Sequence, residues 1–141
     1  MLERPNVFEV DLDAIAFNVA ALRQRIGSDV ELLAALKANA YGFGIERVSE
    51  TVLSAGANGL AMVDVEHAVS LRRRGIEAPM LLYGGTPLSA DVVRAVEDYR
   101  LWPTLLDEED ARRVAEQGQR TRERVPEVRR RHGTHGLRAG A

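Results

Sequence analysis

The sequence predicts an α/β fold built on a parallel sheet, because short apolar runs alternate with stretches of helical period and glycine-bearing breaks separate them. The chain has 141 residues. That length supports one hydrophobic core but is short for a complete eight-stranded barrel. With about five strand-helix units at ordinary element lengths, we expect a partial (β/α)8 barrel.

The first units are predicted from the amino-terminal third. Residues 7–12 alternate apolar and acidic side chains, as a half-buried strand does. Asp11 or Asp13 can then cap a helix that carries apolar residues at helical spacing through residue 26. Residues 30–36 form a nearly continuous apolar run, which is typical of a strand buried on both faces.

The same alternation continues to residue 117. Ser89 or Asp91 can cap the helix that follows the expected strand 80–83. The expected strands are 60–63, 80–83 and 101–105, and the expected helices are 45–53, 66–74, 91–96 and 107–117.

We predict two regions, a barrel-like part at residues 1–118 and a basic tail at residues 119–141, and the charge of the chain also changes near this boundary. Residues 1–111 carry 18 acidic and 10 basic side chains, whereas residues 112–141 carry 3 acidic and 9 basic ones. The segment after residue 120 lacks helical or strand period, and a solvated, disordered tail is favoured over a phosphate-binding patch. Because this tail has no aromatic residues, we expect no nucleic-acid partner.

Composition excludes several kinds of chemistry. The chain has no cysteine, which rules out disulfides, thiolate metal sites and cysteine nucleophiles. Of its three histidines, His67 is far in sequence from His132 and His135, so no metal site is expected. No apolar run approaches the roughly 18 residues of a membrane span, and we expect a cytoplasmic protein without membrane contact.

Lys37 is the only lysine among 19 basic lysine and arginine side chains, and it stands where the predicted strand 30–36 ends. Two interpretations remain open: an amine is required there, or an arginine-rich composition has left one lysine by chance. An amine can lose its proton and attack a carbonyl, which arginine cannot. In a barrel, active sites gather at the carboxyl ends of the strands, where Lys37 would enter an apolar-walled pocket and Tyr41 could reach the same mouth.

The octet from Lys37 to Gly44, Lys-Ala-Asn-Ala-Tyr-Gly-Phe-Gly, closely resembles the pyridoxal-phosphate lysine motif of bacterial alanine racemases, Lys-Ala-Asp/Asn-Ala-Tyr-Gly-His-Gly. The similarity extends from about Phe8 to Glu116 in the family's order and spacing, and it covers the family's amino-terminal barrel domain. Further matching segments are 9–12, 56–63 with 66–76, and 79–84.

This resemblance implies an isomerase that interconverts L- and D-alanine for the bacterial cell wall. By the same resemblance, Lys37 holds pyridoxal 5'-phosphate as an internal aldimine and acts as one of two bases at the substrate Cα. Tyr41 would lie near the cofactor phosphate. Tyr83 would lie in the wall of the cofactor pocket, although a packing residue at the barrel rim is an equally good interpretation. Full-length relatives are homodimers.

The chain also departs from the family pattern. Phe43 replaces the usual histidine of the motif, and the expected later strand with a Val-Asp-Thr-Gly-Met pattern is replaced by an arginine-rich segment. The family's second catalytic base, a tyrosine, and its arginine facing the pyridine nitrogen lie in parts that this sequence does not contain. We therefore expect a truncated racemase fragment with little or no activity. The alternatives are a single-domain pyridoxal-phosphate carrier of the cofactor-homeostasis kind and a non-catalytic fragment.

Overall fold

A four-stranded parallel sheet forms the centre of the protein. The structure is a computed structural model that describes residues 7–124, with side chains placed through Gln117. The strands lie in the order β1-β2-β3-β4, and each neighbouring pair is parallel. Their bounds are β1 (Leu33–Leu36), β2 (Gly59–Met62), β3 (Met80–Leu82) and β4 (Trp102–Pro103).

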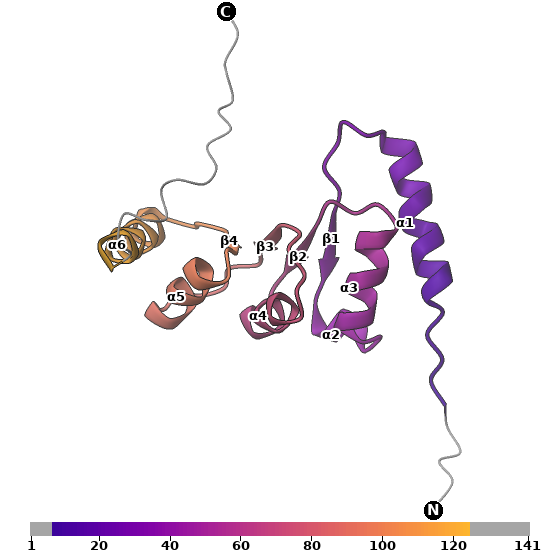
Figure 1. Cartoon of the computed structure of the whole chain (residues 1–141), viewed down its shortest axis with the longest axis horizontal. Coiled ribbons are helices and arrows are strands. Elements are labelled where there is room, and N and C mark those ends of the chain that lie inside the picture. Colours follow the sequence, from indigo (N-terminus) through magenta and orange to yellow (C-terminus); the bar gives the residue numbers. More distant parts are fainter. Residues whose placement is uncertain (1–6, 125–141) are drawn as a thin grey trace, which may run out of the picture.

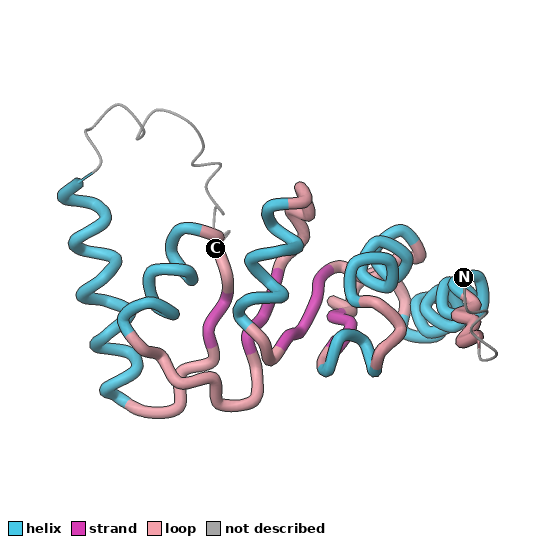
Figure 2. The backbone as a smooth tube through the Cα atoms, turned by 90° about the horizontal axis from the view of Figure 1, so that it is seen from below, coloured by secondary structure: helices cyan, strands magenta, loops and turns pink. Residues whose placement is uncertain are grey.

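Helices connect the strands in sequence order. Figure 1 shows the elements spread from α1 at one end of the molecule to α6 at the other, and Figure 2 shows strands and helices alternating along the chain. None of the helices within residues 7–124 is both long and apolar enough to cross a membrane. Their bounds are α1 (Leu12–Ile26), α2 (Ala38–Tyr41), α3 (Ile45–Ser54), α4 (Val65–Arg73), α5 (Ala90–Asp98) and α6 (Glu108–Arg124).

Two of the predicted helix caps are present. The Asp11 carboxylate accepts a hydrogen bond from the Ala14 amide at 2.9 Å, and the Ser89 hydroxyl accepts one from the Val92 amide at 3.4 Å. Each satisfies an amide that has no partner within its own helix. The capping side chains of Asp11 and Ser89 therefore determine where α1 and α5 begin.

The core lies between the sheet and the helices that cover one of its faces. Leu60 and Met62 of β2 and Met80 and Leu82 of β3 are almost completely buried. They pack in one cluster with apolar residues of α3, α4 and α5, among them Val48, Val52, Ala68, Leu71 and Val96. Burial of each large side chain contributes roughly 1.5–3 kcal/mol, so this cluster is the main source of stability.

The opposite face of the sheet is uncovered by the described residues. Ala35, Ala61, Leu81 and Trp102 are paired across the four strands at one level of the register. At the two edges of this row Ala35 is exposed and Trp102 keeps 53% of its surface accessible, whereas Ala61 is buried and Leu81 half-buried between their neighbours. In a closed barrel this face is the interior, where side chains from alternate strands pack in layers. The fold is thus a partial barrel, as the sequence predicts.

Two predictions about the ends of the chain are wrong. The expected strand at residues 7–12 is absent, since residues 7–11 have no regular structure and α1 begins at Leu12. The described part therefore has four strands rather than five strand-helix units. At the other end, α6 continues through Arg124, past the point where the sequence loses its obvious period. The remaining residues of the predicted tail, 125–141, lie outside the described residues.

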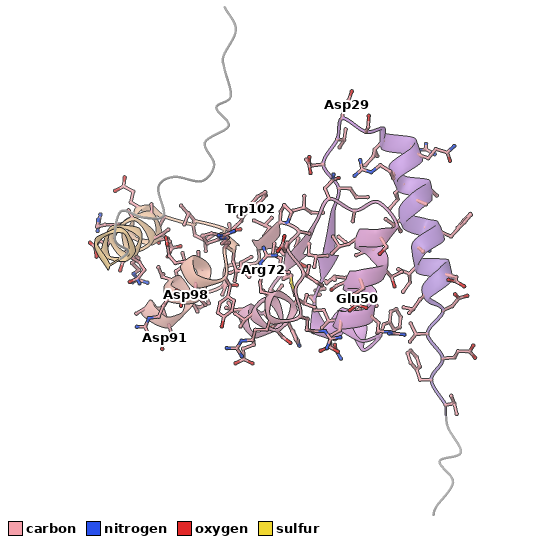
Figure 3. All side chains as sticks on the ribbon, viewed as in Figure 1. Asp29, Glu50, Arg72, Asp91, Asp98 and Trp102 are labelled. Carbon is pink, nitrogen blue, oxygen red and sulfur yellow. The ribbon has the colours of Figure 1, made fainter. Side chains whose placement is uncertain are left out.

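Two arginines bind backbone carbonyls in the loops. Arg23 of α1 donates to the carbonyls of Gly56 and Val30, at 3.0 and 2.6 Å, and so joins α1 to the loops that precede β2 and β1. Arg72 of α4 donates to four carbonyls around the loops that precede β3 and β4. Burial lowers the pKa of the Arg72 guanidinium, whereas the nearby Glu77 raises it. Figure 3 shows Arg72 close to the strands, whereas Asp29 lies at the tip of the loop between α1 and β1.

Candidate functional site

The carboxyl edge of the sheet brings Lys37 and Tyr83 to the same side. Lys37 follows the end of β1 with extended backbone (φ −133°, ψ 164°), and Tyr83 follows the end of β3. Leu36 and Leu82, the preceding residues, are buried among the helices. Because successive side chains of a strand point to opposite faces, Lys37 and Tyr83 are directed toward the uncovered face. With one strand between them, their backbones are roughly 10 Å apart.

A left-handed turn, α2, follows Lys37 immediately. Ala38, Asn39, Ala40 and Tyr41 have φ values of 49°, 54°, 54° and 57°. The Tyr41 amide donates to the Lys37 carbonyl at 3.1 Å, so the turn closes on the lysine itself. Left-handed backbone costs a residue with a side chain roughly 1–2 kcal/mol, and such runs persist where the surrounding structure fixes them.

Asn39 ties this turn to helix α3. Its side-chain Oδ1 accepts a hydrogen bond from the Ile45 amide at 2.8 Å. Its carbonyl accepts from the amides of Gly42 and Gly44, both at 3.1 Å. This role of Asn39 was not predicted from the sequence. The one local signal for it is that asparagine tolerates positive φ and stands six residues before the start of α3.

The Lys37 amine is exposed and lies beside an aromatic ring. Its Nζ is 5.7 Å from the centroid of the Tyr41 ring, within the range of a cation–π contact. Within residues 7–117 no carboxylate lies at ion-pair distance from this amine. The expected apolar-walled pocket around Lys37 is not formed by the described residues, because the sheet is open on the side to which the lysine is directed.

The other predicted features of the site take different positions. Phe43, which stands where the motif usually has histidine, stacks on Phe8 with ring centroids 5.8 Å apart and an interplanar angle of 23°. An aromatic contact to the segment before α1 thus replaces a polar side chain. Tyr83 is half-buried, and its amide donates to the Met62 carbonyl at 2.9 Å, which continues the ladder past β3.

A groove of about 950 Å³ lies between α4 and α5, away from Lys37. His67 and Asp64 line it and approach within 3.3 Å of each other, and Arg73 donates to the Tyr99 hydroxyl beside them. The part of the chain that the structure describes holds no group of three residues able to ligate a metal. The groove lies between helices and reaches the carboxyl edge only at the loops after β2 and β3, without Lys37 in its lining. We therefore assign the candidate site to the Lys37 end of that edge.

The parallel sheet, covered by helices on one face, is part of a β/α barrel. Lys37 lies at the carboxyl edge of this sheet, which is where barrels carry their active sites. Residues 10–129 match the family model described as alanine racemase, N-terminal domain. The chain belongs to the alanine racemase family.

Individual relatives agree with this assignment. The alanine racemase of Synechocystis is 43% identical over 103 residues, which cover 73% of this chain and 27% of that protein. Among solved structures, alanine racemase from Bacillus anthracis with bound L-Ala-P matches with a TM-score of 0.66 and 39% identity, over 72% of this chain and 26% of that one. Alanine racemase from E. faecalis matches with a TM-score of 0.71 and 28% identity, over 77% and 29% of the two chains. The chain spans about a quarter of the length of these relatives.

Proposed function

We propose that Lys37 binds pyridoxal phosphate and that this chain contributes the lysine side of an enzyme that interconverts L- and D-alanine. One observation carries the proposal: the only lysine of the chain follows β1 directly, is directed toward the uncovered face, and has its amine beside Tyr41 with no carboxylate of residues 7–117 at ion-pair distance. Membership of the alanine racemase family supports it. By resemblance to that family, we also propose a cytoplasmic role in supplying D-alanine for the cell wall.

The chemistry of the residues at this edge fits the aldehyde end of the cofactor. A primary amine without a carboxylate partner can condense with an aldehyde, which a guanidinium cannot do. We assign Tyr41 to the cofactor phosphate and Tyr83 to the wall of its pocket. When bound, the cofactor ring supplies an electron sink for the electron pair left at the substrate Cα after proton loss.

In this scheme Lys37 takes the Cα proton from one face of the substrate or returns it to that face, as a general base and acid. Inversion of the carbon needs a second base on the opposite face. Tyr41 belongs to the turn that closes on Lys37, so it approaches from the lysine side and cannot fill that position. We therefore propose that the isolated chain holds the cofactor without efficient racemisation.

Titration of the purified chain with pyridoxal phosphate tests cofactor binding. We expect visible absorbance of a covalent adduct with the native chain and its loss in Lys37→Arg, which keeps the positive charge but removes the nucleophilic amine. Equal absorbance in the two proteins would contradict the assignment of Lys37.

Incubation of the loaded chain with either enantiomer of alanine tests the single-base argument. We expect no interconversion above the rate of Lys37→Arg. Interconversion that requires Lys37 would show that this chain supplies both bases, whereas adduct formation alone would also be the behaviour of a cofactor-carrying protein.

A further inference from the structure

Asn39 connects the left-handed turn to α3 by a side-chain hydrogen bond, in addition to the packing of the buried Ala40 side chain in the core cluster. Its side-chain oxygen caps the first amide of α3, Ile45, at 2.8 Å. The residue at the helix N-cap position, Gly44, has no side chain that could do so. Asn39 thus acts as a cap from five residues further back in the chain.

Helix α3 provides a rigid support for this contact. Ile45, Val48 and Val52 are each at least 95% buried in the core cluster. A hydrogen bond to the Ile45 amide therefore fixes Asn39 to the packed part of the protein. The side chain on the strained turn is held by the core and not by solvent-exposed neighbours.

The strain in the turn makes such a fixed point necessary. Asparagine tolerates left-handed backbone better than most residues with a side chain, but its neighbours Ala38, Ala40 and Tyr41 do not share this preference and have φ values of 49°, 54° and 57°. The Ala40 side chain is buried in the core cluster, so it holds its own place in the turn. Without the Asn39 cap, Ala38 and Tyr41 would lower their energy by relaxing toward negative φ. That relaxation would move the Tyr41 ring away from Lys37.

We infer that Asn39 is a positioning residue: by capping Ile45 it holds the left-handed turn that keeps the Lys37 amine beside Tyr41, and it thereby presents the amine to the cofactor. The last step rests on the proposed function, whereas the geometry of the turn does not. Two contacts define this geometry. The Ile45 amide donates to Asn39 Oδ1 at one end of the turn, and the Lys37 amine lies 5.7 Å from the Tyr41 ring centroid at the other.

The single lysine allows a direct test of this geometry. In protein labelled with ¹³C-lysine, one set of side-chain NMR signals reports Lys37 alone. The Tyr41 ring shifts the Lys37 Hε protons while it lies beside them, and Tyr41→Leu gives the value without the ring. We expect Asn39→Ala to move the Hε shift to the Tyr41→Leu value and Asn39→Asp, which keeps the accepting oxygen, to retain the native shift.

A matched control is available at Asn58. Its Oδ1 also accepts from a backbone amide, that of Leu32 at 2.8 Å, and from Arg23, but it lies at the amino ends of the strands. Asn58→Ala should lower stability and leave the Lys37 shift native. If Asn39→Ala does not fold, Asn39→Gln, which moves the oxygen by one methylene, carries the same expectation. A native shift in a folded Asn39→Ala or Asn39→Gln, or no difference between the native chain and Tyr41→Leu, would overturn the inference.

A cofactor experiment separates the inference from the proposed function. At subsaturating pyridoxal phosphate followed by reduction, we expect the yield of modified Lys37 to fall roughly five-fold in Asn39→Ala and to be unchanged in Asn58→Ala. If native Lys37 is not modified while the shifts follow the expected order, the proposed function fails and the positioning of Lys37 by Asn39 stands. If Lys37 is modified equally in the native chain and Asn39→Ala, the positioning role fails and the proposed function stands.

Discussion

Arg72 and Arg74, two residues apart in the sequence, bind different partners. We therefore expect their replacement to change stability by different amounts. Arg72 donates to the carbonyls of Ile76, Ala78, Tyr99 and Arg100, at 2.5, 2.8, 2.9 and 3.3 Å. Arg74 approaches Glu46 and Glu50 at 3.7 Å, with all three side chains about half exposed. The matched perturbations are Arg72→Met and Arg74→Met, which keep an unbranched side chain and remove the guanidinium.

The magnitudes follow from these contacts. A hydrogen bond to a charged donor contributes about 1.5–3 kcal/mol. Because Arg72 is only half-buried, water can replace some of its four bonds, so we expect Arg72→Met to lower the free energy of unfolding by about 2–4 kcal/mol in total. An exposed pair at the distances of Arg74 contributes about 0–1 kcal/mol, so Arg74→Met should have a small effect.

Urea unfolding followed by circular dichroism measures both variants. For a slope of about 2 kcal/mol per molar urea, the midpoint of Arg72→Met should fall by about 1–2 M while that of Arg74→Met stays within about 0.5 M of the native chain. Equal midpoints for the two variants would refute the idea that Arg72 joins the loops before β3 and β4.

Three further changes test the packing and capping of the fold. Gly59→Ala should destabilise by about 1–3 kcal/mol, because its Cβ would lie 2.6 Å from the Pro79 carbonyl oxygen; a native urea midpoint would refute this close approach. Leu60→Ala should cost about 2–5 kcal/mol in the same assay, since Leu60 is fully buried between the sheet and the helices, and a loss under about 1 kcal/mol would contradict that placement. Asp11→Ala should cost about 1 kcal/mol in thermal unfolding through loss of the α1 cap, whereas unchanged stability would show that α1 does not depend on it.

The alternation of elements could be predicted from the sequence because each strand and helix carries its own local signal. The apolar runs after residue 30 do form the parallel strands, and Asp11 and Ser89 do begin helices. The strand at residues 7–12 was predicted from the same kind of signal and is wrong. The apolar and acidic residues alternate in this segment, but it pairs with no strand of the described sheet. Its Phe8 side chain stacks on Phe43 instead.

The candidate site could be predicted only in part. The position of Lys37 at a strand end follows from the apolar run before it, and the structure has it there. The left-handed turn could not be predicted, because Ala38, Ala40 and Tyr41 have no intrinsic preference for positive φ and are held there by contacts to α3. The separate roles of Arg72 and Arg74 could not be predicted from the sequence either, because only their tertiary contacts distinguish these two arginines.

Mass spectrometry after borohydride reduction of the chain with pyridoxal phosphate is the most direct test of the proposal that Lys37 is the cofactor lysine. The chain has only one lysine, so any reduced adduct lies either on Lys37 or on the amino terminus. We expect the mass increment on the peptide that contains Lys37 and none on the corresponding peptide of Lys37→Arg. An increment confined to the amino terminus, or no increment in a folded chain, would contradict it.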